Sequence, residues 1–577
     1  MPTPTSVILS RLSLLVLSIF AFTLPFERDS PLFALGPLTV TNVEVTLSLC
    51  LVAAVWLTWR NPLHGKRPFP RWWFLLMGLF IASLLLSSWL TAEFPATALK
   101  ASLRTISGIL LALALPTLIR SRQQFVVVAL ALLAGGLLAA LLGLIELVRG
   151  EAWAILDSLR LTPTAAGPFL RLTGPFDYAN HTAMYFEATL PLLLVATIAA
   201  YENGRRALLM PTLILLFVYL ESTFLTFSRA SFATILLVSL CLAFLLWFAP
   251  QPASKQPSLF WASLAGLTLI LIPVNLLLNN TFRLRLSSEG DNEWYEAHID
   301  APASLQVDAD EIVPITITVH NNGRLHWANS GENLVTIAAI WAQADTQLEW
   351  QNTMRWSLGQ PVAPGESLTI ELPVPTPPAA GNYHLTWNLI QEGIVWFEGK
   401  NGLITSTQVQ VGSTAATAPT TTMNLVQTTP VPAPIPGRLT LWQTAWQIFR
   451  RQPIWGIGLD NFRLVYGREL GHTLWNDSIH TNSWYVETAV STGIIGTLPF
   501  FTWLGLIVAD IWRTLRQPTA WAWQTAVAAG ILAYLIHGLL DYFLLFNSTG
   551  LLFWLLIGFW FSLKQLQTEQ SPTPYAK

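Results

Sequence analysis

Long apolar blocks separated by short polar segments fix the class of this chain. Of its 577 residues, 53% are hydrophobic and only 11% are charged, whereas a soluble domain carries about 25% charged residues. The blocks are roughly twenty residues long, the length of helix that crosses about 30 Å of hydrocarbon. Because lipid offers no partner to a backbone N–H or C=O, such segments must be helical. The sequence therefore predicts a mainly α, polytopic membrane helical bundle.

Twelve membrane-spanning helices are predicted. They lie near 7–25, 38–59, 72–91, 103–119, 124–147, 183–200, 207–225, 230–249, 259–278, 484–510, 519–539 and 546–563. Basic residues collect in alternate short loops, at Arg60, Lys66, Arg67, Arg71, Arg120, Arg122, Arg205, Arg206, Lys255, Arg513 and Arg516. Because cytoplasmic loops are enriched in lysine and arginine, we expect both termini to be cytoplasmic. We expect the bundle to lie in the inner (plasma) membrane. The loops 26–37, 148–182 and 279–483 then face outward. The first span lacks a small-x-small cleavage site, so we expect it to be retained.

The outer segment 279–483 is too long to be a simple connector. Residues 300–412 hold short alternating runs such as IVPITITVHN and YHLTWNLI, separated by glycine-containing and asparagine-containing turns. Such regular short strands predict an antiparallel β-sandwich, and the sequence of this segment resembles an immunoglobulin-like module. The two cysteines, Cys50 and Cys241, lie in predicted spans, so the sandwich must fold without a disulfide. Asp308 and Asp310 match the DxD pattern of nucleotide-sugar transferases, but nucleotide sugars are not expected on the outer face. A spacer, or a module that contacts glycan or protein, is the preferred interpretation.

The remaining chain divides by composition. Residues 1–283 form an N-terminal bundle of nine spans, 413–437 a Thr/Pro-rich linker, 438–483 an interfacial helix and an outer loop, and 484–565 the last three spans. In RLTLWQTAWQIFRRQP, the residues Leu439, Trp442, Ala445, Trp446 and Phe449 recur at helical spacing, and Pro453 ends the helix. Tryptophan with arginine on such a helix suits the membrane interface; the alternative is a helix packed on the bundle.

Polar side chains gather at the outward ends of the predicted spans. The set comprises Arg171, Asp177, Asn180, His181, Arg229, His480, Asn482, Glu487, His537 and Asp541. Arg229 runs against the positive-inside bias and must lie in or near the bilayer, where it either faces an internal site or snorkels to the interface. Arg171 lies in a polar loop, where a solvated arginine is also ordinary. His537 and Asp541, four residues apart, are expected to form a structural polar pair.

These residue types point to one kind of chemistry. Two arginines that face one outer cavity suit a pyrophosphate, because guanidinium offers paired donors and stays charged. No P-loop or dinucleotide fingerprint is present, so the energy for synthesis must arrive within the substrate, as in a lipid-pyrophosphate-linked sugar. His480 is a candidate general base for an acceptor hydroxyl, because histidine is the residue type most often used for proton transfer, with Glu487 orienting its ring. The alternative is a histidine hydrogen-bonded at the start of a helix. No metal and no cofactor is expected, and a net charge of −2 gives no reason to expect a nucleic-acid partner.

Four segments resemble the O-antigen ligase and O-antigen polymerase (Wzy-like) family. They are GPFDYANHTAMYFEATLPLLL, TFSRASFATILL, GRLTLWQTAWQIFRRQPIWGIGLDNF and the segment from Asn482 to Gly496. The resemblance implies a metal-independent glycan transferase with a C-type glycosyltransferase-like fold. It implies that an arginine pair, here Arg171 and Arg229, engages an undecaprenyl-pyrophosphate donor, and that a histidine at the start of the late helix serves the acceptor. The β-sandwich is additional to the usual family pattern.

The family histidine has two candidate positions in this sequence. In the family it stands eleven residues before a glycine, and eleven residues before Gly493 is Asn482, whereas His480 lies two residues earlier. The leading hypothesis is a membrane glycosyltransferase that transfers or polymerises glycan from a lipid-linked donor onto a glycan, lipid or protein acceptor. In it Arg171 and Arg229 bind the pyrophosphate, His480 acts as the base, Asn482 and Glu487 assist, and Asn180, His181, His537 and Asp541 support the site. The alternative is a non-catalytic polysaccharide exporter or a surface-display protein.

Overall fold

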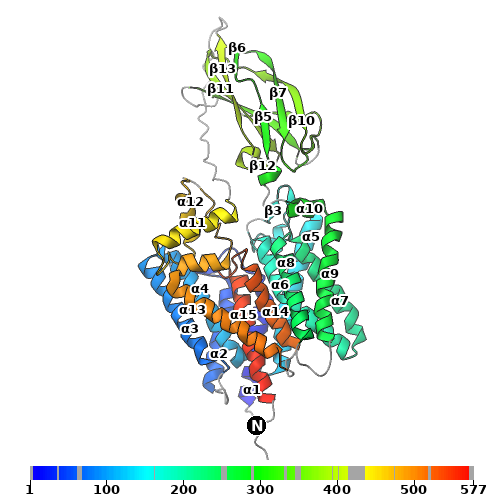
Figure 1. The fold of residues 1–577 in the computed structure, drawn as a ribbon, viewed down its shortest axis with the longest axis vertical. Coiled ribbons are helices and arrows are strands. Elements are labelled where there is room, and N and C mark those ends of the chain that lie inside the picture. The colour runs from blue at the N-terminus through cyan, green and yellow to red at the C-terminus, as the bar shows by residue number, and fades with distance from the viewer. Residues whose placement is uncertain are drawn as a thin grey trace, which may run out of the picture.

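A helical bundle carries a β-domain at one end (Figure 1). The computed structural model describes residues 4–35, 38–60, 68–160, 163–248, 256–287, 292–330, 334–344, 353–392, 394–400, 402–412, 436–472, 475–517 and 522–570. The bundle comprises α1 (Pro4–Thr23), α2 (Asn42–Arg60), α3 (Arg71–Leu90), α4 (Pro95–Leu118), α5 (Arg122–Arg149), α6 (Ala179–Glu202), α7 (Arg206–Leu225), α8 (Arg229–Trp247), α9 (Gln256–Leu278), α13 (Trp484–Leu515), α14 (Ala522–His537) and α15 (Asn547–Gln570).

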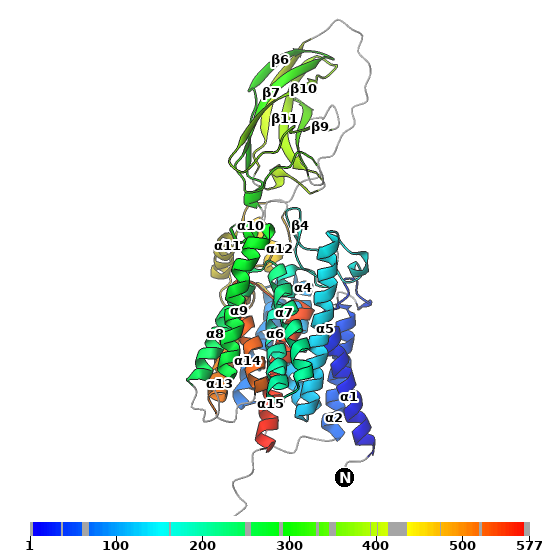
Figure 2. The ribbon, with the colours of Figure 1, turned by 90° about the vertical axis from the view of Figure 1, so that its right-hand side faces the viewer.

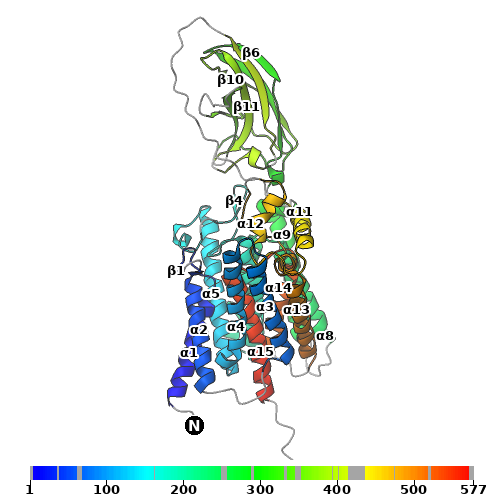
Figure 3. The same cartoon turned by 90° about the vertical axis from the view of Figure 1, so that its left-hand side faces the viewer.

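Every predicted span corresponds to one of these helices. Among the described residues, ten helices are long and apolar enough to cross a membrane, and the apolar helices Ser10–Thr23 and Ala522–His537 are shorter. The mainly α, polytopic prediction is therefore confirmed, with ten candidate spans in place of twelve. Helix α1 begins and α15 ends at the end of the bundle opposite the β-domain (Figures 2 and 3). Lys66, Arg67 and Lys255, three of the basic residues used to orient the bundle, lie outside the described residues, and the orientation stays a prediction.

Two of the departures from the predicted bounds lie in α4 and α13. Helix α4 begins at Pro95, eight residues before the predicted 103, because proline is well accommodated in the first turn of a helix. Helix α13 is interrupted at Gly493, whose φ of 59° and ψ of −166° are not helical. The single predicted span 484–510 is therefore a short outer helix followed by a membrane-length one.

Helices α6 and α15 form the centre of the bundle. In each, 89% of the most apolar window is buried inside the protein. Large aromatic side chains fill the space around α15, among them the fully buried Trp503, Trp554 and Trp560. Because lipid and core are equally apolar, close packing rather than water exclusion holds such helices together.

The β-domain consists of two sheets that share one core. One sheet has the order β10-β7-β5 and the other β6-β13-β11-β8-β9, with β12 paired to β11. The strands are β5 (Ala297–Asp300), β6 (Ser304–Asp308), β7 (Ile312–Asn321), β8 (Val335–Gln343), β9 (Met354–Ser357), β10 (Ser367–Pro375), β11 (Gly381–Gln391), β12 (Val395–Trp396) and β13 (Thr405–Gly412). All pairings are antiparallel except that of β13 with β6. Ile317 of one sheet and Trp387 of the other lie in the same buried cluster, so the inserted β-sandwich is present. Its immunoglobulin-like character stays a prediction.

Short elements lie outside the long helices and the two sheets. They are the hairpins β1 (Phe33–Leu35) with β2 (Leu38–Val40) and β3 (Ala165–Ala166) with β4 (Phe169–Leu170), and the helices α10 (Asn280–Ser287), α11 (Arg438–Arg451) and α12 (Phe462–Glu469). Single 3-10 turns lie at Ala154–Leu156, Asn292–Trp294 and Phe397–Gly399. Helices α11 and α12 lie on the bundle beneath the β-domain (Figure 1). Of the predicted linker 413–437, residues 413–435 lie outside the described part of the chain.

Candidate functional site

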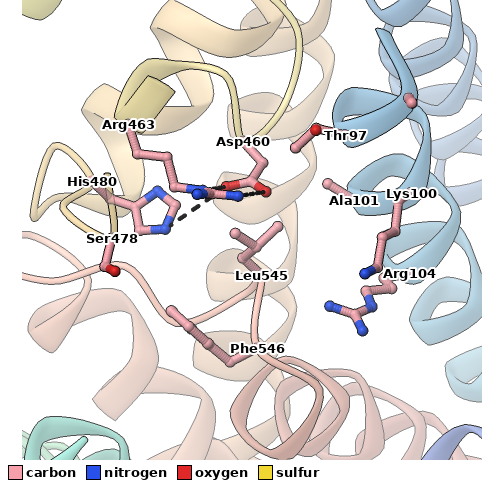
Figure 4. Close-up of a pocket in the computed structure, with 11 residues that line it drawn as sticks. Thr97, Lys100, Ala101, Arg104, Asp460, Arg463, Ser478, His480, Leu545 and Phe546 are labelled. Carbon is pink, nitrogen blue, oxygen red and sulfur yellow. Dashed lines mark hydrogen bonds and ion pairs between the residues drawn. The ribbon is translucent and has the colours of Figure 1, made fainter. Parts of the chain in front are cut away.

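A polar cavity opens at the end of the bundle that faces the β-domain. Its volume is about 440 Å³, and its walls come from the start of α4, the loop before α12, the loop before α13 and the loop before α15. The lining residues are Ala96, Thr97, Lys100, Ala101, Arg104, Asp460, Arg463, Ser478, His480, Leu545 and Phe546 (Figure 4). Three of the eleven side chains are cationic, and His480 and Asp460 lie among them.

Two glycines let the backbone build one wall of this cavity. The turn at 453–458 crosses the interruption of α13, and four backbone hydrogen bonds join them: Ile457 N to Val490 O, Gly458 N to Ser491 O, Ile494 N to Pro453 O and Ile495 N to Ile454 O. A Cβ on Gly456 would lie 2.5 Å from the Ser491 carbonyl, and one on Gly493 would lie 2.3 Å from the Ile454 carbonyl. Both glycines also have positive φ. Gly456 in the turn and Gly493 in α13 therefore allow the two backbone segments to cross in direct contact.

This crossing places Asp460 and Glu487 on either side of His480. The His480 Nε2 atom lies 3.9 Å from Asp460 Oδ1, and its Nδ1 atom lies 3.7 Å from Glu487 Oε1. Both distances exceed a hydrogen bond, and neither His480 Nδ1 nor Glu487 Oε1 has a hydrogen-bond partner. Catalytic contacts are often this long before substrate binds. Glu487 is itself fixed, because its Oε2 accepts a 3.0 Å hydrogen bond from Thr481 N.

The loop that carries His480 is held from both sides. Trp442 of α11 donates its indole N–H to Thr481 O at 2.9 Å, and the Tyr542 ring lies 5.5 Å from the imidazole. Burial raises the pKa of the Tyr542 hydroxyl well above its ordinary value, so this neighbour stays protonated. The imidazole is thus confined while one side remains open to the cavity.

Arg463, Lys100 and Arg104 make the cavity electropositive. Arg463 forms a two-point ion pair with Asp460, at 2.5 Å from Nε to Oδ1 and 3.1 Å from Nη2 to Oδ2. Burial opposes the charge of Arg463, but the hydrogen bond and the charge of Asp460 outweigh it and raise the pKa of the guanidinium. Arg104 contacts Glu44 of α2 at 3.1 Å through Nε. Lys100 and Arg104 face Arg463 and His480 across the cavity (Figure 4), an arrangement that suits a phosphate-containing ligand.

Arg171 does not line this cavity. It is buried, with 2% exposure, and its Nε donates to Thr226 O at 2.8 Å and its Nη2 to Asn180 Oδ1 at 2.7 Å. Asn180 Nδ2 in turn donates to Asp541 Oδ2 at 2.7 Å. Three of the predicted site residues thus form one hydrogen-bonded chain behind the cavity wall.

Arg229 is also absent from the cavity lining. It is the first residue of α8 and is partly buried. It lies three residues after Thr226, whose carbonyl accepts from Arg171, so both predicted arginines lie at the same end of the bundle.

Two of the predicted supporting histidines occupy different surroundings. His181 packs on Phe546, with 4.0 Å between ring centroids, and Phe546 is a wall of the cavity. His537 is fully buried and pairs through Nδ1 with Glu187 of α6. The direct partner of the His537 imidazole is therefore Glu187, whereas Asp541 Oδ2 accepts from Asn180 Nδ2.

Asn482 has the left-handed backbone conformation, with a φ of 52°. Asparagine tolerates this conformation better than most residues. Asn482 is not among the cavity-lining residues, whereas His480 is. Of the two candidate positions for the family histidine, the structure places His480 in the cavity.

Helix α11 is present where the helical spacing predicts it. The side chains that it buries are Leu441, Thr444, Ala445 and Ile448. Leu439 and Trp446, two of the residues at helical spacing, are 67% and 59% exposed. The helix therefore packs on the bundle with one face and presents aromatic surface on another.

Several cavity residues were missed from sequence. Asp460 and Arg463 lie in the glycine-rich segment GIGLDNFRLVYG. In the structure Asp460 has a positive φ of 64°, which is uncommon for residues other than glycine. Lys100 and Arg104, one helical turn apart near the start of α4, run against the positive-inside bias in the predicted orientation, as Arg229 does. Among the described residues, no group of three or more His, Cys, Asp or Glu side chains is arranged to hold a metal ion.

Comparison with known proteins gives a match for one segment of the chain, which holds part of this site. Residues 396–501 match the model of a family described as O-antigen ligase. No curated protein and no solved structure matches the chain. Together with the ten candidate spans, the match supports an O-antigen ligase-like function in a multi-pass inner-membrane protein. The matched segment holds Glu487 and four of the eleven lining residues, Asp460, Arg463, Ser478 and His480, and the match supports the O-antigen ligase family for this part of the chain.

Proposed function

We propose that this protein is a glycosyltransferase that transfers or polymerises glycan from an undecaprenyl-pyrophosphate-linked donor onto an acceptor on the extracytoplasmic face of the membrane. The observation that carries the proposal is the position of His480, between two carboxylates, on the same side of the cavity as Arg463 and opposite Lys100 and Arg104. The proposed sidedness follows from the basic loops of the sequence.

In the proposed reaction His480 accepts the proton of an acceptor hydroxyl as that oxygen attacks the anomeric carbon of the donor sugar. The bond from the anomeric carbon to the phosphate oxygen breaks, and the lipid pyrophosphate leaves with the bonding electrons. Asp460 and Glu487 stabilise the imidazolium that forms, because each carboxylate lies within 4 Å of one ring nitrogen.

The leaving pyrophosphate gains negative charge on the bridging oxygen. We assign its stabilisation to Lys100, Arg104 and Arg463, since these cations line the cavity. Arg171 takes a positioning role in this proposal, because two of its guanidinium nitrogens are already engaged by Thr226 and Asn180. Arg229 remains the second candidate for the pyrophosphate.

The test is release of lipid pyrophosphate from a lipid-linked oligosaccharide by the purified full-length protein. His480→Gln should lower the release rate by about 10²–10⁴-fold, the contribution of a general base, while Asn482→Gly, which removes the side chain but permits the positive φ, should retain most of it. Unchanged turnover in His480→Gln would overturn the assignment. Lys100→Ala should lower the release rate if the cavity cations bind the pyrophosphate. Arg229→Ala should lower it if Arg229 does. Glycan that crosses the membrane without bond cleavage would identify an exporter instead.

A further inference from the structure

The hairpin of β3 and β4 joins the β-domain to the bundle at a second place, far in sequence from the chain connections of the domain. Ala166, at the tip, is 3% exposed and lies within the hydrophobic core of the β-domain. The Phe169 ring meets Trp294 edge to face, with centroids 6.5 Å apart. Gly167, between them, has a φ of 57° and leaves no room for a side chain against Trp294 and Tyr295. The hairpin tip is therefore a part of the β-domain core.

The base of the same hairpin is fixed to the bundle. Arg171 N donates to Thr164 O at 2.9 Å and closes the hairpin. Thr164 then accepts from Ala179 N through its hydroxyl, also at 2.9 Å, which ties the hairpin to the start of α6. Leu172 N donates to Leu225 O at the end of α7. Ala166 at the tip and Arg171 at the base are thus five residues apart in one hydrogen-bonded hairpin, so we expect a displacement of the tip to move Arg171.

From Arg171 the contacts continue to the cavity. Its guanidinium donates a hydrogen bond to Asn180 Oδ1, and Asn180 Nδ2 donates one to the carboxylate of Asp541. The other oxygen of Asp541 accepts from Tyr542 N at 2.8 Å, which fixes the loop whose Tyr542 ring packs on His480. The same loop supplies Leu545 and Phe546 to the cavity wall. An unbroken series of contacts therefore runs from Trp294 in the β-domain to the imidazole.

We propose that the β-domain is a positioning part of the transfer site, and that Trp294 and the hairpin tip set the geometry of the cavity through Arg171. This inference rests on the proposed function. A spacer would need only its two chain connections, whereas this domain also encloses a hairpin that belongs to the bundle. The second contact makes the placement of Arg171 depend on the folded β-domain.

The perturbation that tests this is Gly167→Ala. The added Cβ would lie 2.9 Å from Trp294 Cε3 and 3.0 Å from the Tyr295 hydroxyl, so the tip must move. Gly365→Ala is the matched control: its φ of 83° imposes a similar backbone cost, it lies in the same domain, and its Cβ would have nothing within 4 Å. Both variants are assayed as full-length protein for lipid pyrophosphate release and for thermal unfolding.

We expect Gly167→Ala to lower kcat on the order of tenfold relative to Gly365→Ala, since small displacements of positioned groups cost this much or more. KM for the donor should match that of the control, and overpacking should lower the melting temperature of Gly167→Ala but leave it above the assay temperature. Trp294→Phe removes the ring atoms that the new Cβ meets, and Gly167→Ala with Trp294→Phe should recover activity toward that of Trp294→Phe alone. Equal kcat in the two glycine variants, or no recovery in the double variant, would overturn the inference. Failure of the wild type to release lipid pyrophosphate would overturn the proposed function instead.

Discussion

Gly493→Ala is the sharpest probe of the backbone crossing beside the cavity. A Cβ at this position would lie 2.3 Å from Ile454 O and 2.7 Å from Gly456 N, and these are backbone atoms that no rotamer change can move. The φ of 59° with a ψ of −166° is also a conformation that glycine alone occupies readily. The variant must therefore strain the chain at residue 493 and also separate the turn at 453–458 from α13.

The magnitude follows from the contacts that would be lost. Backbone strain at such a position costs about 2 kcal/mol. Separation would break at least the hydrogen bonds from Ile494 N and Ile495 N, at about 1 kcal/mol each. The expected loss of unfolding free energy is therefore about 4 kcal/mol.

Gly505→Ala in the same helix is the control. Its Cβ would have nothing within 4 Å and its φ is not positive, so it should be neutral or stabilise by up to about 1 kcal/mol. Reversible unfolding in mixed micelles measures both free energies, and pyrophosphate release measures the site. If Gly493→Ala unfolds within about 1 kcal/mol of Gly505→Ala, the crossing does not hold the turn against α13 and the reasoning fails.

Two further predictions concern charge near the cavity. Asp460→Asn keeps a residue that tolerates the left-handed conformation but removes the negative charge beside His480 and Arg463. Turnover should therefore fall about tenfold, while the melting temperature stays unchanged. A full loss of folding would show that Asp460 has a structural role only. Glu27, in the loop before α2, has a raised pKa because burial outweighs its hydrogen bond from Asn547 and the charge of Arg104. Its stabilising contribution is therefore complete below the ordinary pKa of 4.5 and is lost as pH rises through the higher folded value. The melting temperature of Glu27→Gln should accordingly depend less on pH above 4.5 than that of the wild type, and parallel curves for the two proteins would contradict this.

The sequence determined the parts that depend on local pattern. Apolar length marked every helix of the bundle, because the bilayer imposes one dimension on all of them. Alternating residues and turn signals marked the β-sandwich, and helical spacing marked α11. His480 and Glu487 were also found from sequence, since a polar cluster before an apolar span is a local feature.

Only the tertiary structure decided which polar residues share a cavity. Arg171 and His480 are both polar residues at the outer end of the bundle, but one closes a hairpin behind the wall and the other faces the opening. Asp460 meets His480 only because Gly456 and Gly493 let two backbones cross, and no spacing in the chain encodes that approach. Helix α11 buries Ile448 rather than Trp446 for a similar reason: the bundle, not the helix, selects the face that is covered.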